Sequence, residues 1–102
     1  MLEQKEFYIA GVKFHQLGSI ISKVKVGDYL DLIPEPTNKF DPNAIRIEYP
    51  DADASIMLGY VPKKFSSEIS AMLEIGSNLN CVVTELNVAA EPWEQCKVVI
   101  SE

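Results

Sequence analysis

Helical periodicity is confined to one segment of this 102-residue sequence, so most of the remaining apolar residues must be placed in short strands. The apolar residues of the helical face are Phe65, Ile69, Met72 and Leu73. Residues 66–68 between them are polar, Gly76 follows as a C-cap signal, and Pro62 stands where a first helical turn tolerates proline. The pattern predicts one amphipathic helix over residues 63–75.

Short apolar or alternating segments, bounded by Pro, Gly, Asn or Asp, make up much of the rest of the chain. They are residues 7–12, 29–33, 44–49, 57–61, 81–86 and 97–100. Residues 44–49 alternate apolar and charged side chains and give the clearest half-buried strand. About six short strands and one helix favour a mostly β fold, a small, partly open β-barrel of the OB-like or SH3-like kind.

The length and charge of the chain limit what it is expected to bind. Residues 1–102 are the size of one compact domain, so a single domain with one site is expected. The formal net charge of -6 argues against sequence-blind adhesion to duplex DNA or anionic lipid. The excess negative charge falls mostly after residue 64, however, and the stretch from residue 13 to 64 is neutral. A binding surface in the first two thirds therefore need not repel a nucleic acid.

The cysteines and the single histidine give little support for a metal, a cofactor or catalysis. Cys81 and Cys96 belong to no Cys/His cluster and are predicted to be small apolar residues on strands. His15 has no nucleophile at a recognisable motif spacing, so no enzyme activity is expected. The sequence lacks a leader pattern and an apolar run of about 18 residues, which predicts a cytoplasmic protein with reduced thiols and no membrane partner.

Two clusters of aromatic and basic residues follow predicted strands. Lys13 and Phe14 come after the first strand, where a cation beside an aromatic ring could hold a phosphate and stack a base. From these residues alone, a core position for Phe14 is the favoured reading. Tyr60 precedes Lys63 and Lys64, which stand at the positive end of the predicted helix and so hint at an external anion. Two solvated lysines would give the same pattern.

A third cluster lies in residues 35–43, where Pro, Asn and Asp at turn spacing predict a long ordered loop. A Phe among turn formers is hard to bury, so Phe40 beside Lys39 could offer its ring face to a base. Asp41 or Asn43 could hydrogen-bond a sugar hydroxyl or a base edge. Equally, Asp41 and Asn43 could brace the loop through Asx-turns while Phe40 plugs the mouth of the barrel.

The same loop carries a resemblance to a known family. The residues involved are 11–14, 27–28, 35–45 and 58–62, and the most specific block is NKFDPNAI at 38–45. Over about residues 7–75 the chain closely resembles the HIRAN domain. The resemblance implies an OB-like barrel, in a family whose domain occurs before helicase-like ATPases of DNA repair and as short bacterial proteins.

The resemblance also implies a function, because HIRAN domains that bind DNA capture the unpaired 3′ end of a strand. The expected partner is therefore single-stranded DNA in repair or processing, with a helicase or repair protein as a candidate protein partner and no cofactor. Carried over, Phe40 would stack the terminal base and Asp41 would meet the terminal hydroxyl. Lys13 and Phe14 would hold neighbouring nucleotides. Supporting contacts would come from Asn38, Tyr60 and Lys63.

Two departures from the family pattern bear on this expectation. Phe40 stands where Tyr is common, which removes a hydroxyl contact, and Lys13 stands where Arg would give a broader stacking plane. The alternative function is a protein-interaction module whose loops bind a peptide or partner subunit without binding nucleic acid. The acidity of the chain is consistent with this alternative.

Overall fold

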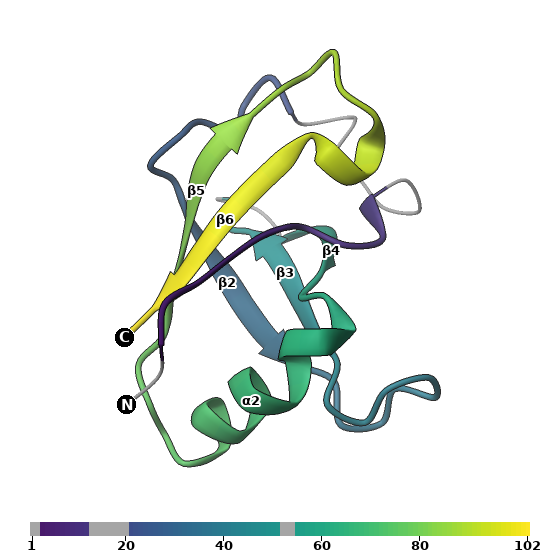
Figure 1. The fold of residues 1–102 in the computed structure, drawn as a ribbon, viewed down its shortest axis with the longest axis vertical. Helices are drawn as coiled ribbons and strands as arrows, with labels where there is room; N and C mark the ends of the chain where they lie inside the picture. The colour runs from purple at the N-terminus through teal and green to yellow at the C-terminus, as the bar shows by residue number, and fades with distance from the viewer. Residues whose placement is uncertain (1–2, 13–20, 52–54) are drawn as a thin grey trace.

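The computed structural model describes residues 3–12, 21–51 and 55–102. Within these ranges the chain forms six strands, one α-helix and one short 3-10 helix (Figure 1). In chain order they are β1 (Lys5–Tyr8), β2 (Tyr29–Pro34), β3 (Ile45–Tyr49), β4 (Ile56–Tyr60), α2 (Lys63–Glu74), β5 (Asn80–Leu86), η2 (Pro92–Glu94) and β6 (Cys96–Ser101). The mostly β fold predicted from the sequence is confirmed.

The strands pair antiparallel in the order β1-β6-β5-β2-β3-β4, and the sheet curls into a half-barrel. The two outer strands are joined just beyond the end of β1. There Ala10 N–H donates to the Tyr60 carbonyl at 2.9 Å, and Tyr60 N–H donates to the Ala10 carbonyl at 2.8 Å. This bridge closes the barrel on one side, which agrees with the partly open barrel that was expected.

Gly59 is required by this closure. A Cβ atom at this position would overlap the Ala10 carbonyl oxygen and would lie 2.6 Å from Cγ2 of Ile9. Only glycine permits so close an approach of two backbones. The glycine next to Tyr60 therefore fixes where the first segment of the chain meets β4.

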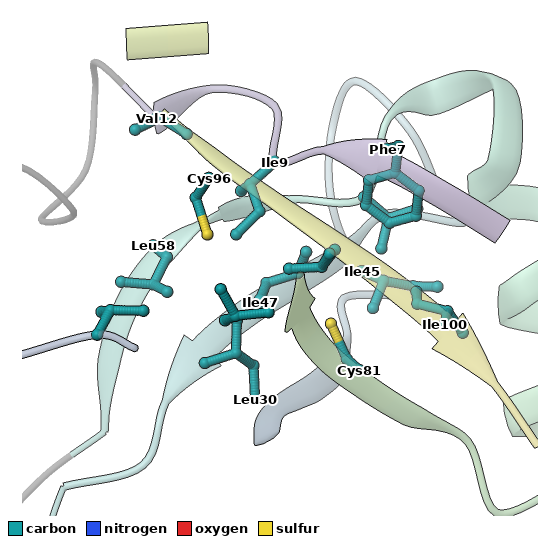
Figure 2. Close-up of a cluster of buried hydrophobic side chains, with 14 of the residues drawn as sticks. Phe7, Ile9, Val12, Leu30, Ile45, Ile47, Leu58, Cys81, Cys96 and Ile100 are labelled. Atoms are coloured by element: carbon teal, nitrogen blue, oxygen red, sulfur yellow. The ribbon is translucent and has the colours of Figure 1, made fainter. Parts of the chain in front are cut away.

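The core lies inside the curled sheet, and each of the six strands contributes a side chain to it (Figure 2). Ile69 of α2 belongs to the same cluster. Strand β3 shows the expected alternation, with Ile45 and Ile47 buried and Arg46 and Glu48 partly exposed. Cys81 and Cys96 are buried in the same cluster as free thiols, on β5 and β6. Burial raises the pKa of both thiols to about 12. The prediction that both are small apolar residues on strands is confirmed.

Helix α2 agrees closely with the predicted 63–75. It ends in a Schellman motif, in which Gly76 (φ 86°) donates its N–H to the Leu73 carbonyl and Ser77 donates to the Met72 carbonyl, each at 3.1 Å. Pro62 is the N-cap residue rather than part of the first turn, because its ψ of 142° is extended. Among the described residues, no helix has the length and apolar character to cross a membrane.

The first strand differs most from its prediction, which was residues 7–12. Strand β1 begins earlier, at Lys5, because Lys5 and Glu6 pair with β6 although their side chains give no apolar signal. It also ends earlier, because the chain leaves β6 after Ile9 and turns to β4 at Ala10. A strand that changes partners appears in the sequence as one long apolar run.

Candidate functional site

The loop between β2 and β3 is ordered by its own polar groups. Glu35 N–H donates to the Ala44 carbonyl at 2.8 Å and closes the base of the loop. Within the loop, Oδ1 of Asn38 accepts the backbone N–H groups of Phe40 at 2.9 Å and Asp41 at 3.1 Å. Oδ1 of Asp41 in turn accepts the Asn43 N–H at 2.8 Å, which is an Asx-turn. The bracing role considered for Asp41 is therefore present.

Phe40 projects from this loop into solvent. Its exposed fraction is 89%, so it does not plug the mouth of the barrel. Its backbone is held by Asn38 while its ring is almost fully exposed, and exposing an aromatic ring to water has an unfavourable free energy. Such a ring, placed on an ordered loop, is available for stacking by a planar ligand.

A pocket of about 440 Å³ lies beside Phe40. Its lining residues are Ala10, Asn38, Phe40, Asp41, Ala44, Tyr60, Val61 and Lys63. The structure thus brings Asn38, Phe40, Asp41, Tyr60 and Lys63 around one concavity, from the loop, the end of β4 and the start of α2. Lys13 and Phe14, the other two predicted site residues, lie outside the described residues.

Three of the lining residues were not predicted from the sequence. Ala10, Ala44 and Val61 are small apolar residues, and Ala44 and Val61 are buried. They reach the pocket because the barrel closes at Ala10 and because Val61 N–H donates to the Ile45 carbonyl at 3.0 Å just beyond β4. No local motif marks these residues, since they reach the pocket only through the closure of the barrel.

The buried position of Ser66 was also not predicted, because the sequence pattern places this residue among the polar residues of the helix. It is only 2% exposed and faces the loop rather than solvent. Its hydroxyl donates to Oδ2 of Asp41 at 2.8 Å and also lies 3.0 Å from the Lys63 carbonyl oxygen. Both oxygens of Asp41 therefore have a partner, one from the loop itself and one from α2.

Glu35 joins the loop to the barrel wall. Its Oε1 accepts Nδ2 of Asn38 at 3.0 Å and the hydroxyl of Tyr60 at 2.9 Å. Its Oε2 pairs with the guanidinium of Arg46 at 3.2 Å, and Arg46 also pairs with Glu48. Burial by itself would raise the pKa of Glu35, but the hydrogen bonds from Asn38, Tyr60 and Arg46 outweigh it and hold this pKa below 4.5. The ionised carboxylate is thus part of the fold of the loop.

The side chains of the two lysines at the start of α2 lie in different surroundings. Lys63 is exposed and lines the pocket. The ammonium of Lys64 lies 4.9 Å from the ring centroid of Phe65, which itself stacks on Phe7 at a centroid distance of 5.6 Å. Of this pair only Lys63 offers its positive charge at the pocket.

Comparisons with known proteins identify the family and the fold of this chain. The sequence matches the family model of the HIRAN domain over residues 3–101. The structure is similar to that of a protein from Lactobacillus plantarum, with a TM-score of 0.77, 17% identity, and coverage of 96% of this chain and 95% of that chain. It is also similar to the crystal structure of the HIRAN domain of human HLTF, with a TM-score of 0.73, 13% identity, and coverage of 95% and 72%. A search of the curated proteins finds no match.

Proposed function

Because this chain belongs to the HIRAN family, we propose that it is a non-catalytic module that binds single-stranded DNA at its 3′ end, in DNA repair or processing. The binding site is the pocket beside Phe40. One observation carries the proposal: an 89% exposed aromatic ring and the neighbouring carboxylate of Asp41 share a pocket with a lysine. At the end of a DNA strand, the Phe40 ring can stack on the base, the Asp41 carboxylate can accept a hydrogen bond from the terminal hydroxyl, and the lysine can pair with a phosphate.

The carboxylate accounts for a preference for an end over an internal position. Asp41 accepts a hydrogen bond from a terminal hydroxyl, but it repels the phosphate that an internal nucleotide would place there. Phe40 stacks the terminal base, and Lys63, which lines the same pocket, meets the preceding phosphate. Lys13 and Phe14 complete the proposal as contacts to neighbouring nucleotides.

Asn38 and Tyr60 support the site mainly by stabilising the conformation of the loop that carries Phe40 and Asp41. Asn38 binds the backbone of Phe40 and Asp41, and both Asn38 and Tyr60 donate to Glu35. An ordered loop loses less conformational entropy when a ligand binds, so a site braced in this way gains affinity. The proposal further places the protein in the cytoplasm, where buried free thiols such as Cys81 and Cys96 stay reduced.

Fluorescence anisotropy tests this function. The titration uses a labelled single strand of about ten nucleotides with a free 3′ hydroxyl, the same strand with a 3′ phosphate, and a duplex with blunt ends. Binding is expected to be tightest for the free hydroxyl end and to weaken as salt rises, because phosphate contacts release counterions. Equal affinity for the free and the phosphate-blocked end would remove Asp41 from its role.

A protein-interaction module is the second candidate function, and one surface favours it. The connection from β5 to β6 exposes Val88 by 68% and Trp93 by 55%, and Glu91 and Glu94 flank the tryptophan. Tryptophan is enriched among residues that dominate protein interfaces. Absence of DNA binding even at low salt would favour this candidate over the first.

A further inference from the structure

Ser66 is the one buried polar side chain in the part of the chain that the structure describes. It shares the inner face of α2 with Ile69, an otherwise apolar face. A hydroxyl in such a place is unfavourable unless it is hydrogen-bonded. Two acceptors are in reach, the Lys63 carbonyl oxygen of its own helix at 3.0 Å and Oδ2 of Asp41 at 2.8 Å.

The two acceptors compete, since a hydroxyl has one proton to donate. A hydrogen bond to an ionised carboxylate is roughly twice as strong as one to a neutral carbonyl. The shorter contact, to Asp41, therefore takes the proton. As a result Asp41 is held at both oxygens, by the Asn43 N–H on Oδ1 and by Ser66 on Oδ2.

A carboxylate that is hydrogen-bonded at both oxygens is held in one orientation, so the directions of its remaining lone pairs are fixed. An ionised carboxylate has about four acceptor sites, so the two bonds leave room for a ligand hydroxyl. Asp41 lines the pocket, whereas Ser66 does not, so Ser66 acts on the ligand only through this carboxylate. Without Ser66 the carboxylate would retain only the Asx-turn and could rotate away from an incoming phosphate.

We infer that Ser66 is a positioning residue that sets the selectivity for a free 3′ hydroxyl over a 3′ phosphate, by holding the Asp41 carboxylate toward the pocket. This inference rests on the proposed function. It assigns the discrimination to a buried side chain on α2 and not to the loop alone. Lys63, in the same helical turn, lines the pocket. This turn therefore supplies both the cation of the site and the hydroxyl that holds the Asp41 carboxylate.

The test compares Ser66→Ala with Ser67→Ala, the same substitution at the exposed neighbouring position of α2. For each variant, the affinity for a single strand ending in a 3′ hydroxyl is divided by the affinity for the same strand ending in a 3′ phosphate. Ser66→Ala is expected to lower this ratio about tenfold, while Ser67→Ala leaves it at the wild-type value. Ser66→Cys, which keeps the size but is a weaker donor, is expected to fall between them.

The outcomes separate this inference from the proposed function. If the wild-type protein does not distinguish the two ends, the proposed function fails and the inference fails with it. If the wild type does distinguish them and folded Ser66→Ala keeps the same ratio, only the inference is overturned. Thermal unfolding shows whether Ser66→Ala is folded. If it is not, Ser66→Cys decides, since a wild-type ratio in that variant would contradict the role of the hydrogen bond.

Discussion

Tyr60 donates its hydroxyl hydrogen bond to Oε1 of Glu35 at 2.9 Å, between residues 25 positions apart in the sequence. The same oxygen accepts Asn38, so one carboxylate ties the loop between β2 and β3 to the end of β4. The pocket lies between these two segments. The geometry of the candidate site therefore depends on a residue that does not line it.

The charge of Glu35 predicts a pH dependence of stability. The folded protein holds the pKa of Glu35 below 4.5, so the unfolded chain takes up this proton at a higher pH than the folded chain does. The stabilisation is present above the ordinary pKa and is lost as pH falls through the lower folded value. Urea unfolding at a series of pH values should show Glu35→Gln less stable than wild type by about 1–3 kcal/mol at pH 7.

This difference between wild type and Glu35→Gln should shrink as the pH falls below about 4.5, because protonation removes the same charge from the wild-type protein. Other carboxyl groups titrate in both proteins, so the difference between the two curves isolates Glu35. Parallel curves over the whole range would mean that the charge of Glu35 does not stabilise the fold.

Replacing Phe40 with Ala should separate binding from stability. The ring is 89% exposed, so its removal should leave the free energy of unfolding within about 0.5 kcal/mol of wild type. If the ring stacks a base, the same substitution should weaken binding of a single strand by about 1–3 kcal/mol. Phe40→Tyr keeps the ring and should bind at least as well. An unchanged titration with Phe40→Ala would show that the ring takes no part in binding.

Gly59→Ala should destabilise the barrel at its closure. The added methyl group would meet the Ala10 carbonyl and the Ile9 side chain, and overpacking of this kind costs about 1–3 kcal/mol. Because Ala10 lines the pocket, single-strand binding should fall as well. Gly27→Ala is the matched comparison. At φ 96° it strains the backbone but meets no atom within 4 Å, so it should lower stability without weakening binding.

The two cysteines should be unreactive in the folded protein. Both thiols are buried, and burial raises their pKa to about 12, so at neutral pH almost none of the reactive thiolate is present. A disulfide-exchange reagent with a coloured product should detect both thiols rapidly in denaturant and neither rapidly in native buffer. Fast reaction of one thiol in native buffer would show that its strand opens readily.

The parts of the fold that local patterns determine were predicted well. Residues 44–49 and 63–75 carry their own periodicity and end signals, and the observed β3 and α2 match them within about a residue at each end. For Phe40 the local chemistry left exposure and a plug of the barrel mouth equally open, and the structure decides for exposure. The limits of β1 were missed, since they depend on pairing with β6 and on the bridge to β4.

The supporting contacts of the site could not be predicted, because they join residues far apart in the chain. Ser66 meets Asp41 across 25 positions, and Arg46 meets Glu35 across 11. In the sequence, Ser66 is indistinguishable from the other polar residues of an amphipathic helix. Arg46 is likewise indistinguishable from any outward-facing polar residue of an alternating strand. Their roles depend on how the loop folds back on the barrel, which a sequence pattern does not record.

The pairing of β1 with β6 has a consequence for how the molecule assembles in the cell. These strands come from opposite ends of the described chain, and Lys5 lies opposite Ile100. During synthesis β1 has no partner until β6 has left the ribosome. Contacts of such wide sequence separation form slowly, and an unpaired strand is prone to aggregation meanwhile. The β1–β6 pairing is therefore expected to be a late step in the folding of this domain.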